Sequence, residues 1–376
     1  MLRDVALDLH AHPELALQEH HAAEVLGAAL EGDGFALERG VAGMPTAFVG
    51  RSGSGRGGPR VAVLMEYDAL PGVGHACGHN LIAAGGLGAA LAARQALGDV
   101  PGELMAVGSP AEEAVGGKII ELEAGVFDGV DAALMFHPGT HNWPIRHATA
   151  CMDVTMRFYG KAAHAAGAQA GINALNPVIH TFVGIDGLRQ HMPETARIHG
   201  IVTNGGQAPN IVPEYAEASF IVRALTMEAC EQLWQRVRAI AEAAAAMSGA
   251  RVEFDCGRIY AERKNNRLLA DLYAQHLRAT GERVEAATLK GGTGSSDIGN
   301  ISLRLPTIHP YAAVAEPGVA GHSREMTRAA ASERGLTAML HVAQALAHTA
   351  VDLFLDPGLV TQAWEVFRTT GPDLPA

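Results

Sequence analysis

The chain has 376 residues, of which 48% are hydrophobic and 18% charged, and its formal net charge is −12. This length and composition indicate a globular protein of two or three domains, and the acidic balance without a lysine or arginine cluster argues against a nucleic-acid partner. The first residues are charged and the four cysteines are scattered, so we expect a cytoplasmic protein without a signal peptide, membrane partner or disulfide framework.

Residues 1–30 place apolar side chains at helical spacing up to the break in EGDGF, which predicts a helix. The segment TAFVG predicts a strand. The apolar run RVAVLME is typical of a strand buried in a parallel sheet, and it leads to two acids, Glu66 and Asp68. Next comes HACGHNLIAAGG, in which Cys77 stands between two histidines before a helix of small residues.

Two more predicted strands end in residues that bind metals. Glu112 and Glu113 follow GELMAVGS, and His137 follows DAALMF. In α/β sheets the ligand site lies at the carboxyl ends of the strands, so these residues are expected to share one site. His322, in GHSREM, lies in the C-terminal segment and is the last candidate ligand.

The pattern changes near residue 149. From there the segments read strand, helix, strand, strand, helix, strand, which is the order of a small α+β domain with an antiparallel sheet. Alternating α/β sequence resumes after residue 260. We therefore predict an α/β domain formed by residues 1–148 and 260–376, interrupted by an inserted α+β domain at 149–259.

Five side chains form the predicted metal site: Cys77, His79, Glu113, His137 and His322. Thiolate, imidazole and carboxylate are the ligands expected for zinc or another first-row divalent metal, and manganese and cobalt are alternatives. Five ligands exceed what one catalytic zinc takes, so we predict two metal ions per chain. Cys77, Glu113 or a solvent hydroxide would bridge them.

The neighbouring acids suggest separate roles. Glu112 is the predicted general base, which takes a proton from metal-activated water and delivers it to the leaving amine. Asp68 is placed to accept a hydrogen bond from a ligand imidazole and to fix its tautomer. Two alternatives stay open: Cys77 as the nucleophile of a cysteine amidase, and a non-catalytic binder with a relict metal site.

Several segments together resemble a known family. They are LHAHPEL, EYDALPGVGHACGHNLIAAG, SPAEEAVGGK, FYGKAAHAA, NGGQAPNIVPEYAEASFIVRALT, GSSDIGNIS and GHSREM. Their order is similar to that of the dinuclear zinc metallopeptidases and amidohydrolases of the aminoacylase and carboxypeptidase type. Within that group they most resemble the branch of hippurate hydrolases, aminobenzoyl-glutamate hydrolases and aminoacylase-like dipeptidases.

The resemblance implies a zinc-peptidase-like α/β/α catalytic domain and an inserted lid domain, with a four-stranded antiparallel sheet and two helices, through which a homodimer forms. His164 matches the lid histidine that stabilises the oxyanion, often from the partner subunit. Four further positions match substrate contacts: Asn210, Arg223, Gly292 and Thr293.

This sequence departs from many hippurate-type relatives at Asn80, where those relatives have an acid, and in detail around GHSREM and IHPYAAV. These segments border the pocket and so affect the substrate. The predicted function is metal-dependent hydrolysis of the amide bond of a small N-acyl amino acid or dipeptide. The alternative at the same metal site is hydrolytic deamination of a small aromatic amine.

Overall fold

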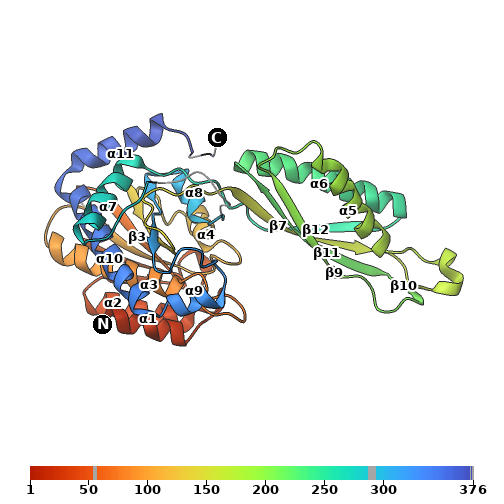
Figure 1. Cartoon of the computed structure of the whole chain (residues 1–376), viewed down its shortest axis with the longest axis horizontal. Coiled ribbons are helices and arrows are strands. Elements are labelled where there is room, and N and C mark those ends of the chain that lie inside the picture. Colours follow the sequence, from red (N-terminus) through yellow and green to blue (C-terminus); the bar gives the residue numbers. More distant parts are fainter. Residues whose placement is uncertain (54–56, 287–293, 373, 375–376) are drawn as a thin grey trace. The chain divides into compact units, whose positions relative to one another are not determined.

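The computed structural model describes residues 1–53, 57–286, 294–372 and 374. The chain forms two compact units (Figure 1). The first unit consists of Met1–His147 and Arg263–Ala376, and the inserted unit consists of Ala148–Glu262.

The inserted unit begins one residue earlier and ends three residues later than the predicted range of 149–259. The reason lies in the residues that follow its last strand. Tyr260 exchanges two backbone hydrogen bonds with Cys151, and the Glu262 carboxylate accepts one from the backbone N–H of Met227. Residues 260–262 are therefore bonded to the inserted unit, although their sequence carries no strand pattern.

A six-stranded sheet is the centre of the first unit. Four neighbouring strands pair in parallel. At one edge two further strands follow, and each of them pairs antiparallel with the strand before it. In spatial order the strands are β1 (Ala36–Arg39), β2 (Phe48–Gly53), β4 (Glu103–Ser109), β3 (Arg60–Glu66), β5 (Ala132–Leu134) and β13 (Thr307–Ile308). Beside them, β6 (His137–Gly139) and β14 (Tyr311–Ala313) form a short parallel pair. The segment predicted as one strand through His137 is thus two strands, β5 and β6.

Helices pack around this sheet (Figure 1). They are α1 (Leu2–Ala11), α2 (His20–Gly32), η1 (Val41–Gly43), α3 (His79–Leu97), α4 (Gly117–Glu123), α7 (Arg267–Ala279), α8 (Ile298–Ser302), α9 (Arg324–Ala329), α10 (Glu333–Leu355) and α11 (Pro357–Thr369). Helix α10 is long and apolar enough to cross a membrane by length and composition. Here it packs along α3 and α7, with most of its apolar side chains in the core.

The helix predicted over residues 1–30 is two helices. Helix α1 ends at Ala11, α2 begins at His20, and Leu15 lies in the segment between them. Pro13 explains the break, because proline lacks a backbone N–H and disfavours a helical conformation in the residue before it.

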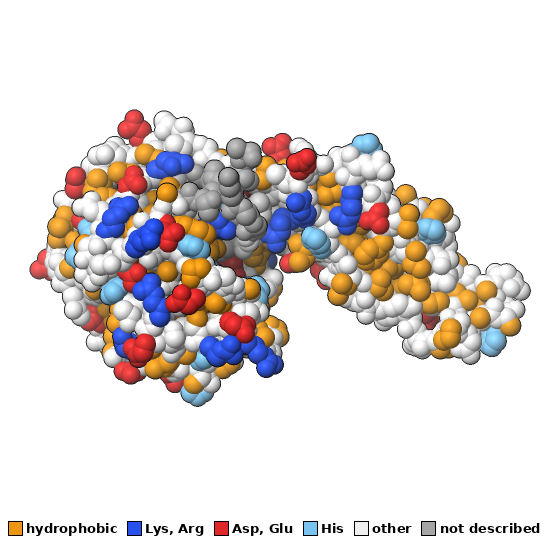
Figure 2. Space-filling model, viewed as in Figure 1, with side chains coloured by type: hydrophobic (Ala, Val, Ile, Leu, Met, Phe, Trp, Pro, Cys, Tyr) orange, Lys and Arg blue, Asp and Glu red, His pale blue; other side chains and the backbone are white. Residues whose placement is uncertain are grey.

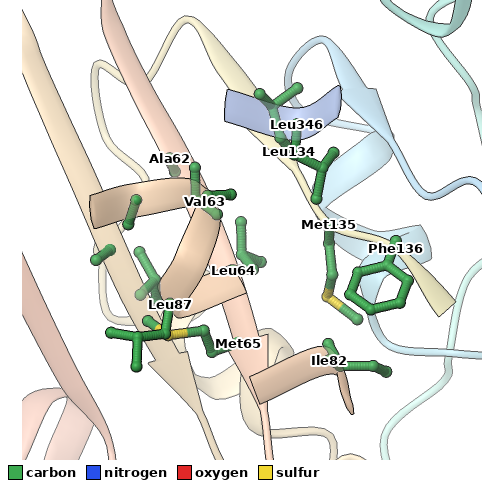
Figure 3. Packing of buried hydrophobic residues seen from close by; sticks show 14 of the residues in the cluster. Ala62, Val63, Leu64, Met65, Ile82, Leu87, Leu134, Met135, Phe136 and Leu346 are labelled. Carbon is green, nitrogen blue, oxygen red and sulfur yellow. The ribbon is translucent and has the colours of Figure 1, made fainter. Parts of the chain in front are cut away.

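Buried apolar strands hold the carboxyl end of β3 in place. Every β3 residue after Arg60 is buried, as expected for a strand covered on both faces. Figure 3 shows β3 side chains packed with those of α3, Leu346 of α10 and the β5 segment. At Gly86 of α3 an added Cβ would lie 2.6 Å from the Met65 side chain, so only glycine allows this close approach of helix and strand. Glu66, at the end of β3, is therefore held at a fixed position inside the unit.

The inserted unit contains a four-stranded antiparallel sheet in the order β12, β7, β11, β9. Its long strands alternate buried and more exposed residues, because α5 and α6 cover one face. The elements are β7 (Ala150–Tyr159), β8 (Ala163–His164), η2 (Ala165–Ala170), α5 (Leu175–Arg189), β9 (Arg197–Asn204), β10 (Ile211–Val212), β11 (Tyr215–Ala224), α6 (Met227–Ser248) and β12 (Arg251–Cys256). The predicted order and the antiparallel four-stranded sheet with two helices are confirmed.

Candidate metal centre

The five predicted ligands come together at the carboxyl ends of the parallel strands of the first unit. Cys77, His79 and His137 form one group whose ligand atoms all lie within 4.8 Å of one another, and Cys77, Glu113 and His322 form a second. A third group joins His79 to Glu113 and to Glu112. Because Cys77 belongs to the first two groups, it is in position to bridge two ions.

The contact between Cys77 and His137 depends on a glycine. Sγ of Cys77 lies 3.3 Å from Nε2 of His137, whose Nδ1 is 2.6 Å from the carbonyl oxygen of Pro138. Gly78 has φ 80°, and an added Cβ would lie 2.8 Å from the Pro138 side chain. Glycine is therefore needed for the turn before α3 to approach the strand that carries His137.

His79 is buried, and hydrogen bonds hold one side of its ring. Its Nδ1 lies 2.8 Å from the carbonyl oxygen and 3.1 Å from Oδ1 of Asp68. These acceptors favour the tautomer with the proton on Nδ1, which leaves the lone pair of Nε2 for a metal. Nε2 is 3.8 Å from Oε1 of Glu113. Asp68 thus contacts the imidazole of a candidate ligand.

His322 reaches the same place from the segment before α9. Its φ of 57° lies in the left-handed region, which is uncommon for a residue other than glycine, and its N–H donates to the carbonyl of Ala76. Nε2 of His322 lies 3.5 Å from Oε1 of Glu113, and the side chain is 58% exposed. A strained backbone tied to the Cys77 turn is typical of a functional position.

The backbone of the two glutamates is held on both sides by buried carboxylates. Ala111, with φ 60°, donates its N–H to Oε1 of Glu19 at 2.9 Å, and Glu113 donates its N–H to Oδ2 of Asp68 at 2.9 Å. The other Glu19 oxygen accepts from the hydroxyl of Thr46. Glu19 and Asp68 therefore fix the position of Glu112 between them.

A buried ion network lies beside the ligands. Nζ of Lys118 lies 2.5 Å from Oε2 of Glu66 and 2.9 Å from Oδ1 of Asp297, and all three side chains are fully buried. The sequence prediction assigned no role to Lys118 or Asp297, or to Glu19. Glu66 could be noticed in the sequence because it ends a predicted strand. Nothing in the sequence around Lys118 distinguishes it from a lysine on the surface.

The charges of this region favour a bound cation. Four carboxyl groups, those of Glu66, Asp68, Glu112 and Asp297, are buried with the single ammonium of Lys118. Buried negative charge without a partner is costly. Oε1 of Glu113 is buried without a hydrogen bond, and Oε1 of Glu66 and Nε2 of His79 face each other at 3.2 Å without forming one. The donor set and its charge therefore fit divalent metal ions.

The surroundings of Glu112 shift the pKa of its carboxyl group. Burial, together with the negative charges of Glu66, Asp297 and Glu113, raises the pKa of Glu112 well above its ordinary value. A carboxyl group of this kind holds a proton readily, which suits a group that receives a proton and passes it on.

The opposite shifts of Cys77 and His137 bear on the nucleophile alternative. Burial raises the pKa of the Cys77 thiol to about 12 and lowers the pKa of His137 to about 4. Both shifts oppose a thiolate–imidazolium pair of Cys77 and His137, whereas a bound metal ion would itself stabilise the Cys77 thiolate. A neutral imidazole is the form that binds a metal.

The remaining predicted residues lie elsewhere. His164 and Asn210 are neighbours in the inserted unit: β8 pairs with β10, and Ala165 donates its N–H to the carbonyl of Asn210. Arg223 pairs with Cys151 near the other end of β11. The eight residue steps from Tyr215, just after β10, to Arg223 span about 26 Å of strand, so Arg223 does not reach His164 and Asn210 within the inserted unit of one chain. Gly292 and Thr293 lie outside the described residues.

Comparison with known proteins finds relatives that are peptidases or amide hydrolases. Residues 150–247 match the family model of a peptidase dimerisation domain. An Xaa-Arg dipeptidase of Mus musculus is 38% identical over 95% of this chain and 86% of its own length. One of the polypeptides of the p-aminobenzoyl-glutamate hydrolase of Escherichia coli is 31% identical over 96% of this chain and 90% of its own. A solved Bacillus subtilis structure, described as a dinuclear metal-binding M20 peptidase, aligns with a TM-score of 0.69 at 22% identity, covering 94% of this chain and 98% of that one.

Proposed function

We infer the reaction of this chain from its family. The chain belongs to the M20 peptidase family, in its branch of aminoacylases and dipeptidases. The chain is an enzyme that hydrolyses amide bonds, as a peptidase or an N-acyl-amino-acid hydrolase. We propose that it cleaves dipeptides and similarly small N-acyl amino acids. Xaa-Arg dipeptides are the first candidates, because the Mus musculus relative is named for them.

The proposed metal ligands are Cys77, His79, Glu113, His137 and His322, with Asp68 orienting His79. Two divalent ions, zinc first among them, would polarise the amide carbonyl and acidify a water molecule. The observation that carries this proposal is the convergence of the thiol, the imidazoles and the carboxylate beside the buried Glu112 and His79, in a cluster rich in carboxyl groups.

Glu112 acts in this proposal as general base and then as general acid. Its carboxylate takes a proton from the attacking water and gives it to the nitrogen of the leaving amine. The raised pKa of Glu112 favours its protonated form, which is the form that donates to the leaving amine. Glu19 and Asp68, through the backbone of Ala111 and Glu113, hold it in position.

We propose a homodimer that forms through the inserted unit. The edge strand β9 leaves one side of its backbone unpaired in the sheet, and an exposed edge is a template for pairing with a second chain. Figure 2 shows hydrophobic side chains gathered on the visible face of this unit. Exposed apolar residues of α5 and β9 include Ile179, Val183, Ile201 and Val202.

The dimer gives a role to the separated residues of the inserted unit. His164 is exposed and Arg223 is half-buried near the far end of the sheet. We propose that Arg223 binds the substrate carboxylate, with which a guanidinium forms paired hydrogen bonds. The partner subunit's His164 and Asn210 would then reach the same substrate, and His164 would stabilise the oxyanion. Gly292 and Thr293 are proposed as further pocket residues.

The experiment that tests this function combines metal analysis with a substrate panel. The purified enzyme is measured before and after chelation, and after addition of zinc, manganese or cobalt. The panel holds Xaa-Arg dipeptides, N-acetyl and N-benzoyl amino acids, aminobenzoyl-glutamate and small aromatic amines. We expect about two metals per chain at the catalytic centre and amide hydrolysis that is lost and restored with them. Full amide hydrolysis without metal would refute the proposal, and ammonia release from the amines alone would establish the deaminase alternative.

A further inference from the structure

A second cluster of metal-binding side chains lies on the surface of the first unit, outside the site described above. It consists of Asp8 on α1, His12 immediately after α1, and His21 in the first turn of α2. One carboxylate oxygen and one ring nitrogen of each histidine all lie within 4.8 Å of one another. The proposed catalytic reaction uses none of these residues.

The carboxylate of Asp8 lies between the two imidazoles. Its Oδ2 is 2.6 Å from Nε2 of His21, and its Oδ1 is 3.2 Å from Nδ1 of His12. The two rings stand with their centroids 5.0 Å apart. Among the residues that the structure describes, Asp8 forms its ion pairs with these two imidazoles and with no lysine or arginine, so a metal ion would replace the ring protons that now lie between the imidazoles and the carboxylate.

The backbone around the cluster is already ordered without a cation. The carboxylate of Glu14 accepts hydrogen bonds from the N–H groups of His21 and Ala22, both at 2.9 Å, and so caps α2. The N–H of His12 donates to the carbonyl oxygen of Asp8. These bonds fix both histidines at their Cα atoms. Nδ1 of His12 also lies 2.9 Å from the carbonyl oxygen of Asp8, so the His12 ring has to leave this contact and rotate when an ion binds.

We propose that Asp8, His12 and His21 form a third cation site for a divalent first-row metal, with zinc as the ion that best suits two imidazoles and a carboxylate. Ligand atoms around tetrahedral zinc stand about 3.3 Å apart, so small rotations of these side chains complete the site. The side chains are 37–60% exposed, which leaves water free to fill the remaining position.

Occupation of this site would join α1 to α2 across the segment at residues 13–19. That segment contacts the backbone next to Asp68 and Glu112: the carbonyl of Glu14 accepts from the N–H of Ala69, and Glu19 accepts from the N–H of Ala111. A cation at the surface therefore stabilises the loop that holds Asp68 and Glu112 in place. The site acts as a peripheral staple that responds to the concentration of free metal.

The test uses the metal-loaded enzyme and added Zn²⁺, with zinc content measured by equilibrium dialysis and unfolding followed by temperature. We expect His21→Gln to bind about one zinc ion per chain fewer than the parent at micromolar free zinc. We also expect it to lose most of a zinc-dependent rise in Tm of a few degrees. Asp8→Asn, which removes the charge without changing the shape, serves as a second variant.

His20→Gln is the matched control, because His20 is exposed, adjacent in sequence and outside the cluster. It should bind zinc as the parent does. Equal zinc content and an equal rise in Tm in the parent, His21→Gln and Asp8→Asn would overturn the proposal. The measurement is a difference between parent and variant, so it stands or falls separately from the metal content and activity of the catalytic centre.

Discussion

The two units of the chain place their functional residues in opposite ways. In the first unit the candidate ligands lie within a few ångströms of one another, against buried strands and a buried ion network. In the inserted unit His164 and Asn210 lie at one end of the sheet and Arg223 at the other. The first unit brings the proposed metal ligands together, whereas the proposed substrate contacts of the inserted unit lie apart and, in our proposal, meet through a second chain.

Burial follows the same division. The strand β3 is covered on both faces and ends in Glu66, whose charge is fixed by Lys118. The strands β7 and β11 are covered by helices on one face only. Chemistry that depends on tuned protonation belongs in the first unit, because low dielectric and fixed charges shift pKa values there. In our proposal, recognition and association belong to the inserted unit, which has exposed apolar residues.

The largest effect is expected for Glu112→Gln, in the buried cluster. Loss of the general base should lower kcat by about 10²–10⁴-fold while the metal content stays unchanged. The exposed Glu38→Gln, on β1, is the control and should keep full activity. A fall in kcat of less than about tenfold would remove Glu112 from the chemistry.

The second prediction compares buried and exposed lysines. Lys118→Met leaves Glu66 and Asp297 without their cation, so it should lower the free energy of unfolding by about 3–5 kcal/mol. Lys161→Met, at an exposed position in the inserted unit, should change it by less than about 0.5 kcal/mol. Urea unfolding of both variants measures the difference. Similar free energies of unfolding for the two variants would mean that the buried ion network contributes no more to stability than an exposed lysine.

The third prediction addresses the separation within the inserted unit. His164→Ala and Arg223→Ala should each lower activity by about 10²-fold or more. If the two residues act on one substrate from different chains, mixing the two inactive variants restores up to about a quarter of the parent activity, because mixed dimers contain one intact site. If the mixed samples exchange subunits and stay inactive, His164 and Arg223 do not act on one substrate from different chains.

The smallest expected effect is that of Glu19→Gln. The amide keeps one acceptor oxygen and so loses one of the contacts to Thr46 and to the N–H of Ala111. We expect kcat to fall about 10–100-fold through displacement of Glu112, with KM changed by less than about twofold. The pH profile of kcat should shift as well, since Glu112 changes its surroundings. A lower Tm with unchanged kcat would make Glu19 a stability residue only.

The sequence predicted the parts of this structure that depend on local pattern. Apolar runs followed by ligand-type residues located Cys77, His79, Glu113 and His137, because a strand end is visible in the sequence itself. The antiparallel domain was predicted from its strand and helix order. The break between α1 and α2 was missed because helical spacing outweighed the effect of Pro13.

Contacts between distant segments could not be predicted in this way. Lys118 bonds to Asp297 across 179 residues, and Glu19 bonds to Ala111 across 92. No local pattern distinguishes these charged residues from surface ones; only the assembled sheet shows that they are buried. The separation of His164 from Arg223 likewise follows from strand register, which requires the structure.

X-ray absorption at the zinc edge tests the central claim, a metal centre built on Cys77, most directly. The enzyme would be loaded with about two zinc ions per chain, in the His21→Gln background so that the surface cluster does not contribute. We predict a sulfur ligand at about 2.3 Å from zinc that disappears in Cys77→Ser. A spectrum with nitrogen and oxygen ligands alone, unchanged by Cys77→Ser, would contradict the account.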